Sequence, residues 1–265
     1  MLKITRPGAG CIVSGNAEGY CEPFFMSSEK LEKIKIKDYH NIVILTGAGV
    51  SVASGIAPFR GPGGLWTDRD IERCATAHAL RSHPEVVWEA FAELRRKAAV
   101  TEPNATHYAL AELEKHRPNT VVLTQNIDGL HQAAGSHNVV ELHGNIHRTR
   151  CTKCSVKPYK DKTIEYRTCE RCGAPLRYDI ILFEESLDPE VMEAAYKALA
   201  ECDLFIAAGT SGIVWPSAGF AEIASRAGAR TVLVNLETLP TRWFEEQLVG
   251  KAEEIFPELF DYQGV

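Results

Sequence analysis

The sequence predicts a doubly wound α/β fold, in which helices cover both faces of a parallel β-sheet, and three observations carry that prediction. Short apolar runs recur along the chain, helical patterns lie between them, and a glycine or a polar residue follows each run. Uninterrupted apolar runs of this length are typical of strands that are buried on both faces of a sheet. The predicted strands are residues 41–46, 120–124, 204–208 and 231–234. A ligand site is expected where the carboxyl ends of these strands meet.

Helices are expected between the strands, because apolar residues recur there at helical spacing and capping residues precede them. Asn104 is a suitable N-cap for a helix that includes residues 107–114. Asp188 is a suitable N-cap for a second helix, and Pro189 is favoured at the first helical position after it. These two helices follow the alternation of strand and helix that a doubly wound sheet requires.

Three stretches depart from the alternation. Residues about 61–103 are helical with no strand between, and residues about 145–180 contain paired cysteines and few apolar residues. Both are expected to be insertions into the sheet domain that together form a smaller lobe. Residues 1–25 are rich in glycine and proline and have no helical or strand period. We expect them to be a mobile leader, or to precede the true start codon, with an ordered arm as the alternative.

Composition excludes several classes of protein. The 265 residues include 45% hydrophobic and 24% charged residues, which is ordinary globular usage and excludes disorder as the main state. The formal net charge of −6 argues against generic binding to nucleic acid or to an anionic membrane. No apolar run approaches the ~18 residues of a membrane span, and no signal peptide is evident at the N-terminus. A cytoplasmic protein is therefore expected, whose cysteines are metal ligands or free thiols.

A glycine-rich loop follows the first predicted strand directly, with the residues Gly47, Ala48, Gly49 and Ser51. Such a loop lets the backbone approach a pyrophosphate, although an ordinary tight turn is an equal alternative. The third glycine of the common dehydrogenase fingerprint is absent. A loop rich in glycine and proline comes next, at residues 57–64, and a long loop beside a nucleotide site is often a lid.

Two side chains of this second loop are candidate ligand contacts. Arg60 is expected to pair with phosphate and Phe59 to cover an aromatic ring; the alternatives are a surface charge and a core aromatic residue. Trp66, a few residues on, is also a predicted cofactor contact.

Two Cys-x-x-Cys pairs predict a zinc site. Cys151 and Cys154 are separated from Cys169 and Cys172 by 14 residues. Each pair folds its two sulfurs onto one side of a turn, and two pairs supply four thiolates in a tetrahedron. Four protein ligands leave no open position, so the Zn²⁺ is expected to be structural.

The motifs together resemble the sirtuins, the NAD-dependent protein deacylases. They are GAGVSVASGIAPFRG (47–61), TQNIDGLHQAAG (124–135), LHG (142–144), the cysteine pairs, GTS (209–211) and NLE (235–237). The resemblance covers roughly residues 30–260. It implies a catalytic domain over 26–265, built from a large Rossmann-like lobe and a small zinc lobe with a cleft between them. The expected large lobe comprises about 30–60, 104–144 and 181–260, and the small lobe about 61–103 and 145–180.

The resemblance also implies the reaction and the roles of residues. NAD loses nicotinamide, the acyl-lysine carbonyl oxygen captures the ribose, and the acyl group is transferred to ADP-ribose. His143 holds the family's base position, whereas His131 and His147 fall outside it, and Asn126 orients the ribose. The implied NAD contacts are Gly47, Ala48, Gly49, Ser51, Phe59, Arg60, Trp66, Gln125, Asn126, Ile127, Asp128, Gly209, Thr210, Ser211, Asn235, Leu236, Glu237 and Ala252. Acyl-lysine protein or peptide is the expected partner, with no specific nucleic acid, no membrane and no indication of oligomeric state.

The chain departs from the family at a few positions. Proline follows Ala57, one place later than usual, and Ala53 stands where many members carry an acidic residue. Glu184 replaces a glycine in the segment that pairs with substrate peptide, where a carboxylate disfavours acidic peptides. In members that prefer succinyl groups, a Tyr-x-x-Arg pair binds the acyl carboxylate; Phe91 and Leu94 stand at those places here. Arg95 is one residue late and is expected to point away from the channel.

Two other classes of function remain open from the sequence. An NAD glycohydrolase or ADP-ribosyltransferase would share the nucleotide lobe. A non-enzymatic module would use the zinc ribbon to bind nucleic acid or protein. The zinc quartet and His143 favour deacylation over the first alternative, and the net charge and the polar cleft residues argue against the second.

Overall fold

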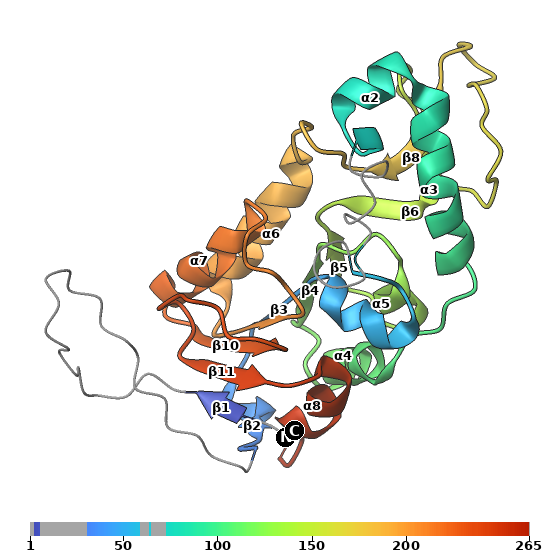
Figure 1. Ribbon diagram of the computed structural model, residues 1–265. Helices are drawn as coiled ribbons and strands as arrows, with labels where there is room; N and C mark the ends of the chain where they lie inside the picture. Colours follow the sequence, from blue (N-terminus) through green and yellow to red (C-terminus); the bar gives the residue numbers. More distant parts are fainter. Residues whose placement is uncertain (1–2, 6–30, 59–63, 65–72, 265) are drawn as a thin grey trace, which may run out of the picture.

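The computed structural model describes residues 3–5, 31–58, 64 and 73–264, and these residues form a large sheet lobe and a small lobe. Figure 1 shows the small lobe, with α2, α3, β6 and β8, at the top of the view, and the main sheet below it. The described part of the chain contains no helix long and apolar enough to cross a membrane.

A seven-stranded sheet forms the centre of the large lobe, in the order β1-β11-β10-β9-β3-β4-β5. Its strands are β1 (Lys3–Thr5), β11 (Glu246–Val249), β10 (Arg230–Asn235), β9 (Leu204–Ala208), β3 (Ile42–Thr46), β4 (Val121–Thr124) and β5 (Val139–Glu141). All neighbours are parallel except β1, which pairs antiparallel with β11 at the edge. Six carboxyl strand ends therefore meet at one edge of the sheet, and they include those of the four predicted strands.

Helices cover both faces of this sheet. Along β3, Ile42 and Ile44 face one hydrophobic cluster, whereas Val43 and Leu45 face the other. The first face is covered by η2 (Ala48–Ser54), α4 (Ala105–His116) and α8 (Ala252–Leu259), and the second by α6 (Pro189–Glu201) and α7 (Phe220–Arg226). Alternate residues of a strand point to opposite faces, so a strand buried on both sides is apolar throughout.

The predicted caps are present. The Asn104 side chain accepts a hydrogen bond from Thr106 N at 2.9 Å and begins α4 in a capping box. Asp188 accepts from Glu190 N at 2.9 Å and begins α6, with Pro189 as its first residue. Both helices thus start where the sequence placed them, because the orphan amides of a first turn need an acceptor.

The small lobe packs helices against a three-stranded sheet that the sequence reasoning did not predict. Its helices are α2 (Ala77–Ser82) and α3 (Pro84–Ala98), and its strands, in the order β7-β6-β8, are β7 (Tyr159–Lys160), β6 (Gly144–Cys151) and β8 (Leu176–Ile180). Trp88 stacks on Tyr178 of β8, with ring centroids 4.4 Å apart. The core of this lobe is thus separate from those of the main sheet.

Arg95 lies inside the small lobe, where it is 1% exposed. Its guanidinium donates to the backbone oxygens of Ile146, Arg148 and Thr163 at 2.7–2.8 Å, and it lies 4.2 Å from the Tyr178 ring centroid. An ion pair with Asp161, at 3.6 Å, balances the buried charge. The prediction that Arg95 points away from the channel is confirmed, and its side chain joins α3 to β6.

The remaining described elements are short: β2 (Ile34–Lys35), η1 (Ile36–Asp38), α5 (Leu130–Ala133), η4 (Ser217–Gly219) and β12 (Phe260–Asp261). Strand β2 pairs with β12, which joins the beginning of the described large lobe to its end. Within the predicted leader, residues 3–5 form the edge strand β1, and the rest lies outside the described residues.

Candidate functional site

A cavity of about 840 Å³ follows the carboxyl edge of the main sheet and continues to the small lobe. Its volume is within the ~300–1,000 Å³ range of small-molecule sites. The predicted residues that line it are Gly47, Ala48, Gly49, Gln125, Asn126, Ile127, His143, Gly209, Thr210, Ser211, Asn235, Leu236, Glu237 and Ala252. Residues from five strand ends and from the β5–β6 connection therefore share one cavity.

Glycines allow the loops after β3 and β9 to touch. A Cβ on Gly47 would lie 2.6 Å from the oxygen of Gly209, and one on Gly209 would lie 2.5 Å from Val50 N. Gly209 also has a φ of +57°, in the left-handed region that side chains disfavour. The amides of Gly47 and Gly49 donate to the oxygens of Ala208 and Gly209 at 3.0 and 2.9 Å. These glycines therefore bring two loops together at the cavity wall.

Asn126 lines the cavity, and the nitrogen of its side-chain amide is held by two hydrogen bonds. Its Nδ2 donates to Gly47 O and to Ser51 Oγ, both at 3.1 Å. Ser51 Oγ in turn donates to Asp128 Oδ2 at 2.7 Å, and Leu130 N donates to Asp128 Oδ1. Ser51 and Asp128 do not line the cavity but lie behind Asn126. With both amide hydrogens used, Oδ1 is left to accept a hydrogen bond from a ligand.

His143 lines the cavity, and one of its ring nitrogens is bonded to the backbone. Its Nδ1 lies 2.9 Å from the backbone oxygen of Gln125. A carbonyl oxygen only accepts, so Nδ1 carries the hydrogen and the neutral ring keeps its lone pair on Nε2. Burial lowers the pKa of His143, and the hydrogen bond to Gln125 opposes that shift. The ring is therefore a neutral base at physiological pH.

Close packing of β6 on β8 sets the position of His143. A Cβ on Gly144 would lie 2.2 Å from Asp179 O, and Gly144 has a φ of +79°. Ile181 N donates to the backbone oxygen of His143 at 2.9 Å. The residue after His143 must therefore be glycine for the small lobe to pack against it.

The two other histidines near this motif have different surroundings. His131 is 1% exposed, with Nε2 2.9 Å from Thr46 Oγ1. Nε2 of His147 lies 2.9 Å from the backbone oxygen of Asp128. Neither residue lines the cavity, whereas His143 does.

The cavity is apolar where it meets the small lobe. Ala75, Phe91, Ile180, Leu182 and Phe183 line this part. Phe91 thus occupies the wall that the sequence predicted, but Leu94 does not line the cavity.

Glu184, at the rim of this part, has a φ of +69° and is the only non-glycine residue of the described chain with a positive φ. Its Oε2 accepts from His78 N at 3.1 Å. Phe183, beside it, exchanges backbone hydrogen bonds of 2.9 Å with Ala75 and Ala77. Strand β8 ends at Ile180, Phe183 then forms an isolated parallel bridge with Thr76, and a turn follows at Glu184.

A polar network joins the loops after β4 and β9 to the end of β10. Gln125 Nε2 donates to Thr210 Oγ1 at 3.1 Å, and Asn235 Nδ2 donates to Thr210 O at 3.2 Å. Ser217 Oγ lies 3.0 Å from Gln125 Oε1 and completes the network. Sequence reasoning missed Ser217, whose only signal is its position after the loop that follows β9.

The cavity has further lining residues that the sequence reasoning did not single out, among them Val52, Val214, Trp215 and Lys251. Among the predicted contacts, Phe59, Arg60 and Trp66 lie outside the described residues.

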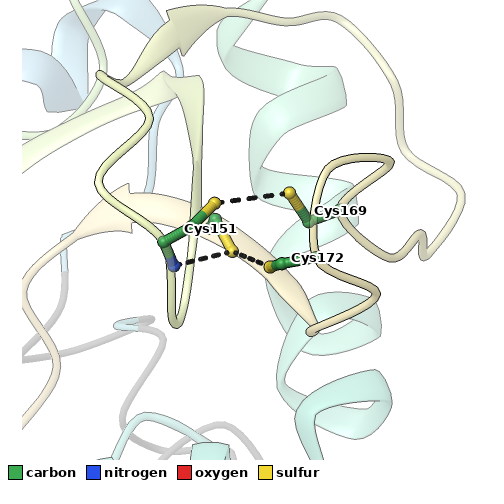
Figure 2. Close-up of side chains that lie close together, drawn as sticks. Cys151, Cys169 and Cys172 are labelled. Carbon is green, nitrogen blue, oxygen red and sulfur yellow. Dashed lines mark hydrogen bonds between the residues drawn. The ribbon is translucent and has the colours of Figure 1, made fainter.

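The four predicted cysteines form one cluster, and their ligand atoms lie within 4.8 Å of one another. Cys151 Sγ lies 3.5 Å from Cys172 Sγ, and Cys154 Sγ lies 3.6 Å from Cys169 Sγ. Tetrahedral Zn²⁺ with Zn–S bonds of ~2.3 Å requires S–S separations of about 3.8 Å. Figure 2 shows the labelled sulfurs pointing toward one another. The four thiolates are thus positioned to bind one zinc ion.

Comparison with known proteins agrees with this geometry. A family model described as the Sir2 family matches residues 47–216. The NAD-dependent protein deacylase of Aquifex aeolicus is 41% identical over 231 residues, which cover 84% of this chain and 95% of that protein.

Two solved structures share the fold. One is a Sir2 homolog–NAD complex, with a TM-score of 0.79 and 36% identity over 85% of this chain and 90% of that one. The other is a Sir2 protein with a deacetylated p53 peptide and 3′-O-acetyl ADP-ribose, with a TM-score of 0.72 and 30% identity over 84% of this chain and 96% of that one. The matched family model, the extent of the sequence identity and the shared fold lead to one conclusion: the chain belongs to the Sir2 family.

Proposed function

We propose that this protein is an NAD-dependent protein lysine deacylase, chiefly a deacetylase, that transfers the acyl group to ADP-ribose and releases nicotinamide. The observation that carries the proposal is the single cavity, which joins glycine-rich strand-end loops, a neutral histidine base and an apolar end. Relatives at about 40% identity bear the names NAD-dependent protein deacylase and deacetylase.

The nucleotide side of the cavity fits NAD. The loops after β3 and β9 carry glycines there, so their backbone amides can approach a ligand without side chains in the way. Such an arrangement suits a pyrophosphate. Glu237, after β10, is suited to bind the hydroxyls of the adenosine ribose, as acidic residues often do in such sheets. Ala252 lines the same side and is assigned to adenine.

Asn126 and His143 supply the chemistry on the protein side. When bound, NAD supplies the glycosidic bond that breaks and the ribose that receives the acyl group. Asn126 Oδ1 accepts a hydrogen bond from a ribose hydroxyl and so orients the ring, because its Nδ2 is engaged. His143 Nε2 takes the proton of a ribose hydroxyl, because its Nδ1–H is engaged by Gln125.

The apolar end accepts the acyl-lysine of a protein or peptide, and we assign acyl contact to Phe91. The large lobe then binds the nucleotide, and the small lobe closes the acyl end and carries a structural zinc ion. A cytoplasmic location and the absence of nucleic-acid and membrane partners stay predictions from the sequence.

Incubation with NAD and an acetyl-lysine peptide library tests the proposal. Release of nicotinamide together with O-acyl-ADP-ribose, in equal amounts, is the expected result. Free ADP-ribose formed without peptide would instead indicate an NAD glycohydrolase, and modified protein an ADP-ribosyltransferase. No consumption of NAD would indicate a binding module. The peptide-free reaction and the unacylated peptides serve as controls.

A further inference from the structure

A chain of buried polar groups lies behind Asn126 and has no part in the chemistry described above. His131 Nε2 lies 2.9 Å from Thr46 Oγ1, and Thr46 Oγ1 donates to Thr124 Oγ1 at 2.9 Å. Thr124 Oγ1 also accepts from the backbone N–H of Asn126 at 3.1 Å. The three side chains are 0–3% exposed. The chain links α5 to the residue assigned to the ribose.

The direction of the hydrogen bonds follows from the donors available. Thr46 has one hydroxyl hydrogen, which it gives to Thr124. His131 Nε2 must then donate to Thr46, so the neutral ring carries its hydrogen on Nε2. Its Nδ1 has no hydrogen-bond partner among the described residues. Burial lowers the pKa of His131 to about 3, with repulsion from His107 as the smaller cause, and the ring therefore remains neutral at physiological pH.

Asn126 is thereby held at two points. Its side chain is bonded to Gly47 and Ser51, and its backbone N–H is bonded to Thr124. The backbone bond limits rotation of the peptide that carries the side chain, and so fixes the position of Oδ1 in a residue that lines the cavity. Positional errors of about 1 Å at a reacting group can lower a rate ~100-fold. The accuracy of this contact therefore matters for turnover more than for nucleotide affinity.

We infer that His131 is a positioning residue that acts through Thr46 and Thr124 to fix the orientation of Asn126 toward the ribose. The inference rests on the proposed function, because Asn126 is assigned to the ribose there. A histidine suits the place, since it provides a rigid N–H donor without a charge. An apolar residue would leave the Thr46 oxygen without that donor in a buried site, where an unmade hydrogen bond is destabilising.

Thr124→Val and Thr46→Val test the inference, with Thr124→Ser and Thr46→Ser as the conservative variants. Valine removes the hydroxyl and nearly keeps the volume, whereas serine keeps the hydroxyl. The valine variants should lower kcat at least about tenfold and leave the Kd for NAD within about threefold. The serine variants should recover kcat to within about threefold of wild type.

Thr106→Val is the matched control. Thr106 is also fully buried and lies in α4, but its hydroxyl has no partner among the described residues and is not part of the chain. This variant should keep the wild-type kcat even if it shifts Tm. A kcat loss as large as that of Thr124→Val would mean that any buried threonine has this effect, and would overturn the inference.

His131 itself is tested by a double-mutant cycle. His131→Phe and Thr46→Val interrupt the same chain, so the double variant should lose no more kcat than the worse single variant. Losses that multiply would contradict the inference, as would wild-type kcat in Thr124→Val. If His131→Phe does not fold, the threonine series decides alone. A wild-type protein without turnover would overturn the proposed function and this inference together, whereas an active wild type with an equally active Thr124→Val overturns the inference only.

Discussion

The Nδ1–H of His143 is engaged by the backbone oxygen of Gln125, which leaves the lone pair of Nε2 to accept a proton in the proposed reaction. His143→Ala should keep the fold and bind NAD, but should lose about 10²- to 10⁴-fold in turnover, the usual contribution of a histidine base. Because burial lowers its pKa, the acid limb of the kcat/KM profile should fall below the ordinary histidine value of about 6.5. Turnover by the alanine variant within a few-fold of wild type would refute the assignment.

Phe91 determines the expected acyl preference. It lines the apolar end of the cavity, and Arg95 is committed to the backbone of the small lobe. The carboxylate of a succinyl group would lose its water there without gaining a cation, at a cost of several kcal/mol. Acetyl and longer neutral groups should be removed at least about tenfold more efficiently than succinyl groups. Matched peptides that differ only in the acyl group measure this ratio, and equal rates would point to a cation that reaches the channel.

Glu184 adds a carboxylate to the rim of the same end. Peptides with basic residues beside the acyl-lysine should therefore have a lower KM than acidic ones, by about two- to tenfold at low salt, and the ratio should shrink as salt screens the charge. Glu184→Gln should remove the preference. Glu190→Gln is the matched control, because Glu190 is exposed and does not line the cavity. An unchanged preference in Glu184→Gln would show that another charge selects the peptide.

At the scale of elements, the cysteine cluster joins the end of β6 to the turn before β8. Lys153 N and Cys154 N both donate to Cys151 Sγ at 3.4 Å, as expected around a thiolate ligand. Cys151→Ser should release zinc and loosen the small lobe, because metal binding contributes folding energy in such lobes. Elemental analysis and proteolysis of residues 145–180 measure both effects. Wild-type protein purified without chelator and free of zinc would contradict the prediction.

Residues 183–184, at the rim of the cavity, are attached to the start of α2. Three hydrogen bonds, two from the Phe183 backbone and one to Glu184, attach residues 183–184 to residues 75–78. This attachment bridges Phe183 to Thr76 in place of a continuation of β8. It also explains how a left-handed Glu184 is tolerated: the side-chain bond to His78 offsets a conformational cost of about 1 kcal/mol.

At the scale of the whole molecule, stability should depend on two buried histidines. Burial lowers the pKa of His107 to about 4. Burial, with a smaller contribution from repulsion by His107, lowers the pKa of His131 to about 3. The unfolded chain takes up these protons near pH 6.5, and the folded protein does not. Their stabilising effect is complete above pH 6.5 and is lost as the pH falls toward the folded values. Burial raises the pKa of Asp128, so this single carboxyl group favours the folded state as the pH falls and opposes the effect of the histidines.

Urea unfolding measures the effect. The free energy of unfolding should drop by on the order of 2 kcal/mol between pH 7.5 and 5.5, since each histidine contributes up to ~1.4 kcal/mol per pH unit. His107→Gln should remove about half of the drop, whereas a variant of the exposed His137 should retain it. A flat stability curve over this range would mean that the buried rings are protonated in the folded protein.

Much of the molecule followed from local sequence patterns. The apolar runs became β3, β4, β9 and β10, and residues after those strands line the cavity. The spacing of the cysteines predicted the cluster, because four thiolates at that spacing have few other uses. These features depend on residues close together in the chain, whose preferences act before any distant contact forms.

Several strands were not predicted. Strands β1, β5 and β11 are short, and β6 and β8 carry polar side chains, among them Thr149 and Tyr178, which contact the cation of Arg95. Their pairing depends on a partner strand supplied from far along the chain, and no local period reveals it.

What the sequence alone determined, then, is the alternation of strand and helix, the zinc ligands and the motif residues at the strand ends. Only the tertiary structure decided that Asp128 and Ser51 lie behind Asn126, that Arg95 is buried in the small lobe, and that His131 is bonded to Thr46. The physical reason is the range of the contacts. Strand propensity and metal spacing are local, whereas burial and hydrogen-bond partners depend on which distant segments the packed sheet brings together.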